Sequence, residues 1–122
     1  MAQMGNHMKQ TLPHDQRARA REFYAGLCGC RVMNSPRPDL DLYEFDGGFV
    51  VGLFFVDPAD ALPEAEYLKA GWLEIKVVDP ASFRARVEAL GVTAIPFEDT
   101  SRFYFHAPGG QVFRIAPMDG GV

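Results

Sequence analysis

The fold of this chain is decided by a stretch that occurs twice. Residues 15–31 read DQRARAREFYAGLCGCR, and residues 79–92 read DPASFRARVEALGV. Each copy begins with Asp, continues as an amphipathic segment rich in Arg and Ala, and ends in Leu closely followed by Gly. The closing glycines, Gly29 and Gly91, lie 62 residues apart in a chain of 122. A repeat at half the chain length predicts two copies of one small unit, neither of which buries its apolar face alone.

The first unit is predicted as βαβββ. Asp15 is expected to cap a helix over 16–27, because apolar residues follow it at helical spacing. The sequence Asp46-Gly47-Gly48 predicts a hairpin turn between two strands. The four strands are expected at 8–12, 30–33, 40–45 and 49–56.

The second unit repeats this plan. Asp79 is expected to cap a helix that ends at Gly91, with Pro80 at its first position, where a missing N–H does no harm. A turn is expected at 108–110, which reads Pro-Gly-Gly. The four strands are expected at 72–78, 93–96, 102–106 and 111–116.

These elements predict one α+β domain that spans residues 1–122. Its two βαβββ modules are expected at 8–56 and 71–117, with a cleft between them. The connecting residues 57–70 contain two prolines and four acidic residues, and we expect a solvated linker there.

Composition excludes several classes of function. Hydrophobic residues at 48% and charged residues at 23% are typical of a globular protein. A net charge of −4 argues against nucleic-acid binding, and no apolar run approaches the ~20 residues of a membrane span. The N-terminal residues lack the apolar core of a signal peptide. We therefore expect a cytoplasmic protein without nucleic-acid or membrane partners. Cys28 and Cys30 lack the further ligands of a zinc site and are expected to pack as small apolar residues.

Three stretches resemble one known family. They are the "FY...LG" helix within 19–29, the strand WLEIKVVD at 72–79, and the closing stretch FYFHAPGGQVFRI at 103–115. In this order and spacing they resemble the vicinal oxygen chelate superfamily, which includes glyoxalase I, bleomycin-resistance proteins, fosfomycin-resistance transferases and extradiol dioxygenases. The resemblance implies two βαβββ modules whose curved, mixed sheets form an open cleft, and a homodimer.

The resemblance also implies where a metal would be bound. Metal-using members carry His, His and Glu at three positions that fall here on Lys9, Trp72 and Arg114. None of these side chains ligates a divalent cation in its usual protonation state. We therefore expect no metal and no cofactor. A site rebuilt from His7 and Glu74 would offer only two ligands and remains an alternative.

The same positions indicate a ligand-binding cleft. Trp72 offers a stacking surface, and Lys9 and Arg114 offer donors to an anionic or carbonyl group. Glu74 is expected on the face of Trp72, where it would orient Arg114, and Tyr104 offers a hydroxyl. The alternative is structural: a salt bridge of Glu74 with Arg114 or Lys9, with Trp72 and Tyr104 as plain packing. His106, beside a turn, is expected to be exposed.

Three functional hypotheses follow. The leading one is a metal-independent protein that binds an apolar or aromatic small molecule, as the bleomycin-binding proteins do. The second is a metal-dependent, glyoxalase-like lyase, dioxygenase or transferase with non-standard ligands. The third is an interaction module whose cleft is filled by its own side chains.

Overall fold

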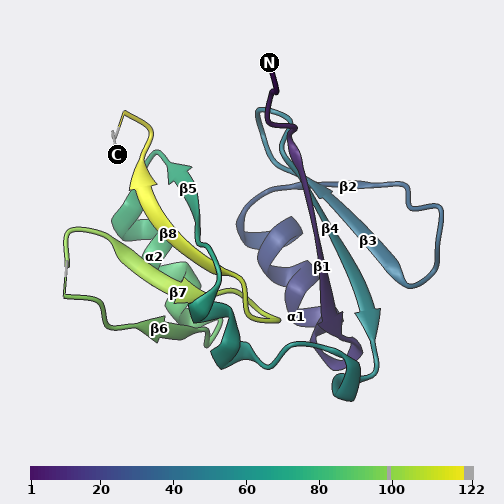
Figure 1. The fold of residues 1–122 in the computed structure, drawn as a ribbon. Helices are drawn as coiled ribbons and strands as arrows, with labels where there is room; N and C mark the ends of the chain where they lie inside the picture. The colour runs from purple at the N-terminus through teal and green to yellow at the C-terminus, as the bar shows by residue number, and fades with distance from the viewer. Residues whose placement is uncertain (99, 120–122) are drawn as a thin grey trace. The chain divides into compact units, whose positions relative to one another are not determined.

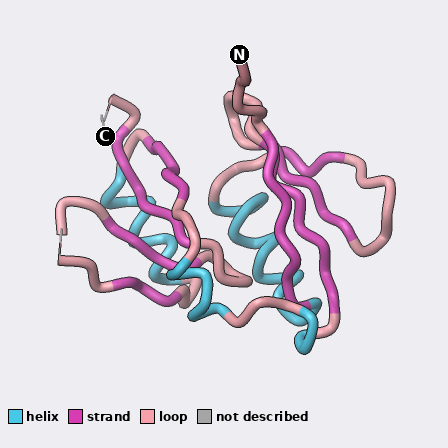
Figure 2. Tube along the Cα trace, in the orientation of Figure 1, coloured by secondary structure: helices cyan, strands magenta, loops and turns pink. Residues whose placement is uncertain are grey.

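The structure is a computed structural model that describes residues 1–98 and 100–119 (Figure 1). The chain divides into two compact units, residues 1–62 and residues 63–122. Each unit contains one four-stranded sheet and one longer helical segment, as the colouring in Figure 2 shows.

The first unit follows the predicted order of elements. Its strands are β1 (His7–Pro13), β2 (Arg31–Met33), β3 (Leu40–Glu44) and β4 (Val50–Val56). Its helical segments are η1 (His14–Gln16), α1 (Arg17–Arg21), η2 (Glu22–Leu27) and η3 (Pro58–Asp60).

The second unit repeats that order. Its strands are β5 (Leu73–Val77), β6 (Thr93–Ile95), β7 (Phe103–His106) and β8 (Val112–Pro117). Its helical segments are η4 (Glu64–Lys69) and α2 (Pro80–Ala89).

The two sheets have the same topology. Sheet A has the strand order β1-β4-β3-β2, and sheet B has the order β5-β8-β7-β6. In each sheet the first pair is parallel and the other pairs are antiparallel. The internal repeat and the α+β class predicted from the sequence are therefore confirmed.

The core of the first unit lies between its long helical segment and one face of sheet A. Phe23 and Tyr24 are fully buried, and the ring of Tyr24 stacks on that of Tyr43 at 5.5 Å. Val51, the partner of Tyr43 in the sheet, is 1% exposed and lies on the same face. Alternation along β1 and β4 therefore assigns Lys9 and Gly52 to the opposite face of sheet A.

The predicted N-cap at Asp15 is wrong. The segment opens with the 3₁₀ turn η1, so Asp15 lies inside a turn, and Gln16 precedes α1 without a side-chain capping bond. The segment then continues as a π-helix, η2, in which the N–H of Cys28 donates to the carbonyl of Phe23 at 2.9 Å. The predicted single helix is thus three short helical types in succession.

The core of the second unit lies between α2 and one face of sheet B. Phe83 and Val87 of α2 are buried, as are Phe105 and Phe113 of the sheet. The predicted cap of α2 is confirmed, since the carboxylate of Asp79 accepts a hydrogen bond from the Ser82 N–H at 3.1 Å.

The expected solvation of residues 57–70 is wrong at Tyr67. This residue of η4 is 8% exposed, and its ring lies against Gly110 in the turn between β7 and β8. Gly110 has a φ of 128°, and a Cβ there would overlap the ring of Tyr67. The turn therefore requires glycine both for its backbone conformation and for the close approach of the ring.

His106 is buried, whereas the sequence predicted exposure. Its Nδ1 lies 2.8 Å from the carbonyl oxygen of Gly110, and the residue is 6% exposed. Residues near turns are usually exposed, but this turn is covered by Tyr67. Among the described residues, no helix is long and apolar enough to cross a bilayer.

Candidate functional site

A row of polar side chains crosses sheet B. Glu74 on β5 pairs with Arg114 on β8, which in turn pairs with Tyr104 on β7. Figure 1 shows β8 running between these two neighbours. Paired residues in neighbouring strands point to the same side of a sheet. The three side chains therefore project together from the face opposite α2.

An ion pair forms the centre of this row. The Nε of Arg114 donates to Oε2 of Glu74 at 2.6 Å, and the two side chains are 12% and 20% exposed, respectively. The Nη1 of Arg114 donates to the hydroxyl oxygen of Tyr104 at 3.4 Å. The hydrogen bond to Tyr104, together with the bond to Glu74 and its charge, raises the pKa of Arg114. Arg114 is therefore a permanent cation.

Aromatic rings surround the ion pair. The guanidinium carbon of Arg114 lies 4.5 Å from the ring centre of Trp72. Tyr104 makes edge-to-face contacts with Trp72, at 5.8 Å, and with Phe97, at 4.5 Å. Trp72 and Phe97 are 44% and 40% exposed, whereas Tyr104 is 8% exposed. The arrangement thus combines two accessible rings with a cation held in a fixed position.

Phe97 was missed by the sequence analysis. It lies after the end of β6, so the alternation of side chains along a strand does not assign it to a face. The sequence offered one signal for it, an aromatic residue directly after the predicted strand 93–96. Its contact with Tyr104 makes it a member of the cluster, which we call the sheet B cluster: Trp72, Glu74, Phe97, Tyr104 and Arg114.

Four of the five predicted site residues belong to this cluster. The salt bridge between Glu74 and Arg114 that the sequence allowed is present. The fifth residue, Lys9, lies on β1 in the first unit, where its Nζ is 5.6 Å from the ring centre of Phe54. Gly52 makes room for it, since a Cβ at Gly52 would lie 3.0 Å from the Lys9 Cγ. The grouping of Lys9 with the other four stays a prediction.

Metal-ligating side chains do not gather in either unit. Within residues 1–98 and 100–119, no three His, Cys, Asp or Glu side chains of one unit come close enough to hold a cation. Cys28 and Cys30 are both free thiols. Burial raises the pKa of Cys30 to about 12, which makes it a poor ligand at neutral pH. These observations supply no ligand set for a metal within a unit.

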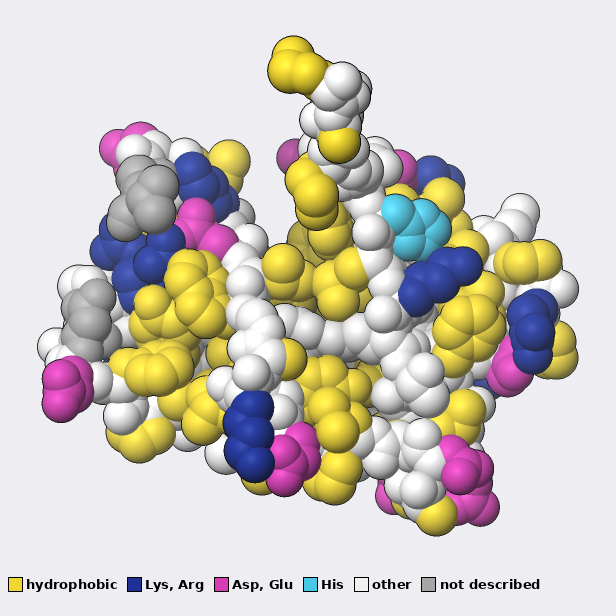
Figure 3. All heavy atoms as spheres, viewed as in Figure 1, with side chains coloured by type: hydrophobic (Ala, Val, Ile, Leu, Met, Phe, Trp, Pro, Cys, Tyr) yellow, Lys and Arg dark blue, Asp and Glu magenta, His cyan; other side chains and the backbone are white. Residues whose placement is uncertain are grey.

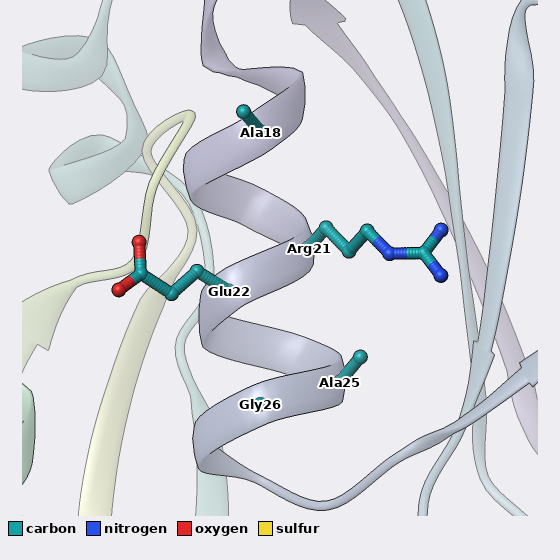
Figure 4. Close-up of a pocket in the computed structure, with 5 residues that line it drawn as sticks. All are labelled: Ala18, Arg21, Glu22, Ala25 and Gly26. Carbon is teal, nitrogen blue, oxygen red and sulfur yellow. The ribbon is translucent and has the colours of Figure 1, made fainter.

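A separate hollow lies on the exposed side of the helical segment in the first unit (Figure 4). It is lined by small residues, and the longer Arg21 and Glu22 extend from the helix in opposite directions. No predicted site residue lines it.

The surface drawn in Figure 3 is chemically mixed. Basic and acidic side chains are interspersed with hydrophobic ones on both units. This distribution agrees with the modest net charge of −4.

The comparisons with known proteins agree on the fold. A Bacillus cereus protein described as "a possible Glyoxalase" matches with a TM-score of 0.68 and 19% identity, over 93% of this chain and 98% of its own. The fosfomycin resistance protein FosX of Listeria monocytogenes matches with a TM-score of 0.73 and 14% identity, over 100% and 94% of the two chains.

A FosX variant from the same organism, described as complexed with Mn(II) and 1S,2S-dihydroxypropylphosphonic acid, matches with a TM-score of 0.69 and 13% identity, over 94% and 90% of the chains. No protein-family model and no curated protein matches the sequence. At these identities the structural matches establish the fold. The chain therefore has the repeated βαβββ fold that the glyoxalase-family and FosX structures share, as its sequence motifs predicted.

Proposed function

We propose that this chain is a small-molecule binding protein that holds an apolar or aromatic ligand on the sheet B cluster and needs no metal. The observation that supports it best is the ion pair of Arg114 and Glu74 beside the half-exposed ring of Trp72. A stacking surface next to a positioned cation is a typical arrangement for recognition of a small ligand.

The electrostatics of the cluster support metal-independent binding. Metal-using members of the superfamily that the sequence resembles have a metal ligand at the position of Arg114. A single positive charge 4 Å from a guanidinium is repelled by about 4 kcal/mol at an effective dielectric of 20, and a divalent cation by about twice that. Glu74 is the only carboxylate of the cluster, and its Oε2 is already bound by Arg114. The residues of the cluster therefore do not fit a divalent cation.

The second candidate is a metal-dependent enzyme with non-standard ligands. The FosX variant described as complexed with Mn(II) and a phosphonic acid has this fold, which favours that candidate. It predicts that the purified chain retains about one divalent metal ion, in a site with the three or four ligands that such sites need.

The test is a ligand screen with two independent readouts. Trp72 is the only tryptophan of the chain, so its fluorescence reports on the cluster directly. Small aromatic compounds are screened by thermal shift and then titrated against Trp72 fluorescence. We expect Arg114→Met to weaken binding of the compounds found. Compounds that bind Arg114→Met as tightly as the unmodified chain in the titration, and that raise the melting temperature of Trp72→Phe by as much as that of the unmodified chain, would contradict the proposal.

The chain offers a matched control variant. Arg84 also lies over an aromatic ring, that of Phe103 at 4.3 Å, and also pairs with a glutamate, Glu88 at 3.5 Å. Arg84→Met therefore removes a comparable set of contacts outside the cluster, and we expect it to leave ligand binding unchanged.

We also propose that the chain forms a homodimer, as the resemblance implies. Light scattering on the eluted peak of a gel-filtration column measures the mass directly. The expected mass is twice the 13.5 kDa of one chain. A mass of one chain at micromolar concentration would contradict this part of the proposal.

A further inference from the structure

We propose that the ligand of the sheet B cluster is a planar aromatic anion, with its negative group on Arg114 and its ring against Trp72 and Phe97. This inference rests on the proposed function and adds the charge and shape of the ligand.

Arg114 has unused hydrogen-bonding capacity. A guanidinium has five N–H donors. Glu74 accepts from Nε with only one of its oxygens, and Tyr104 accepts one long bond from Nη1. Among the described residues, none accepts a hydrogen bond from Nη2. The side chain of Arg114 is 12% exposed, and its remaining N–H groups can donate hydrogen bonds to an anionic group of a ligand.

The rest of the cluster is also rich in hydrogen-bond donors. The hydroxyl oxygen of Tyr104 accepts from Arg114, so its own proton is available to another acceptor. The indole N–H of Trp72 has no acceptor within residues 1–98 and 100–119. A ligand that satisfies these donors must carry acceptors, and carboxylate, phenolate and phosphonate groups are acceptors without competing donors.

The aromatic rings of the cluster favour a planar ligand. Trp72 and Phe97 stand at 86° and 80° to the ring of Tyr104. Both are substantially exposed, whereas Tyr104, which contacts both rings, is buried. The exposed parts of the two rings offer aromatic surface to a ligand, and a flat aromatic ligand gains the most contact with such surface. The cluster thus combines a preference for planar rings with a preference for negative charge.

Glu74 gives the inference a test that depends on the sign of the ligand charge. An anion on Arg114 is repelled by the Glu74 carboxylate, whereas a cation is attracted by it. Glu74→Gln keeps the size of the side chain and removes its charge. The variant should therefore strengthen binding of an anion and weaken binding of a cation.

The experiment uses three probes with one ring and different charges: benzoate, benzamide and benzamidine. Each is titrated against the full chain by Trp72 fluorescence, with saturation-transfer NMR as a second readout. We expect benzoate to bind about fivefold or more tightly than benzamide, because a charge-assisted hydrogen bond is about twice as strong as a neutral one. Benzamidine should bind most weakly of the three.

Variants of Arg114 and Glu74 test which charges determine the preference among the probes. Arg114→Met should abolish the preference for benzoate over benzamide, and Glu74→Gln should tighten benzoate binding by about threefold or more. Glu88→Gln, which removes a carboxylate paired with Arg84, is the matched control and should change nothing. Circular dichroism shows whether each variant is folded, and the ranking of the three probes on the unmodified chain needs no variant.

Two negative results have different meanings. If benzamide or benzamidine binds as tightly as benzoate, the anionic character of the ligand is refuted while the proposed binding function stands. If none of the probes changes Trp72 fluorescence and the wider screen finds no binder, the proposed function itself fails, and this inference fails with it.

Discussion

Replacing Gly110 by Ala tests how the turn that connects Tyr104 to Arg114 is held. The backbone at Gly110 has a φ of 128°, and a non-glycine residue in such a conformation costs about 1–3 kcal/mol. The new methyl group would also overlap the ring of Tyr67, and overpacking of a buried site costs about 1–3 kcal/mol. Alanine also lowers the conformational entropy of the unfolded chain, which offsets about 0.4–1 kcal/mol of this loss in stability. We therefore expect a loss of about 2–5 kcal/mol in the free energy of unfolding.

Urea denaturation followed by Trp72 fluorescence and by circular dichroism measures this loss. A second Gly110→Ala variant is made in a Tyr67→Ala background, where the ring is absent and only the backbone strain remains. The cost of Gly110→Ala should then fall by about 1–3 kcal/mol, which is the coupling between the two residues. An equal cost in both backgrounds would refute the contact between Tyr67 and the turn.

Two further predictions follow from the caps and from the buried thiol. Asp79→Ala should lower the free energy of unfolding by about 1 kcal/mol because it removes a helix cap, whereas Asp15→Ala should have little effect; equal thermal shifts for the two variants would contradict the assignment of the caps. Burial raises the pKa of Cys30 from 9.0 to about 12, so above pH 9 the unfolded chain releases a proton that the folded chain keeps. The contribution of Cys30 to stability should therefore be constant below pH 9 and fall by up to about 1.4 kcal/mol per pH unit between pH 9 and 12, and Cys30→Ala should lack this part of the fall; urea midpoints that fall equally in the variant and the unmodified chain would count against it.

The sequence predicted those parts of the fold that depend on local signals. The repeat around Gly29 and Gly91 predicted two equal units, because both copies carry the same helix-ending pattern. The cap at Asp79 was predictable because Pro80 marks the first turn of that helix. The cap at Asp15 was not, because the chain leaves β1 through a 3₁₀ turn that no capping pattern distinguishes.

The site was predictable where it lies on strands. Alternation along the predicted strand 72–78 put Trp72 and Glu74 on one face, although β5 begins only at Leu73, and the register of Glu74 with Arg114 brings the charges together. The position of Phe97 in the cluster could not be predicted, because no periodic pattern assigns the side chain of a residue that follows a strand to one face. The burial of His106 was missed for a different reason: the segment that covers its turn lies outside the repeat, and pattern matching between the two copies does not include it.

We propose above that the sheet B cluster binds its ligand without a metal. The most direct measurement is a benzoate titration of the full chain after exhaustive dialysis against EDTA, repeated with excess Mn²⁺ and with excess Zn²⁺, with metal content determined by elemental analysis at each stage. We expect the same dissociation constant in all three conditions and no stoichiometric protein-bound metal in any of them. Benzoate binding that appears only when about one metal ion per chain is present would contradict it.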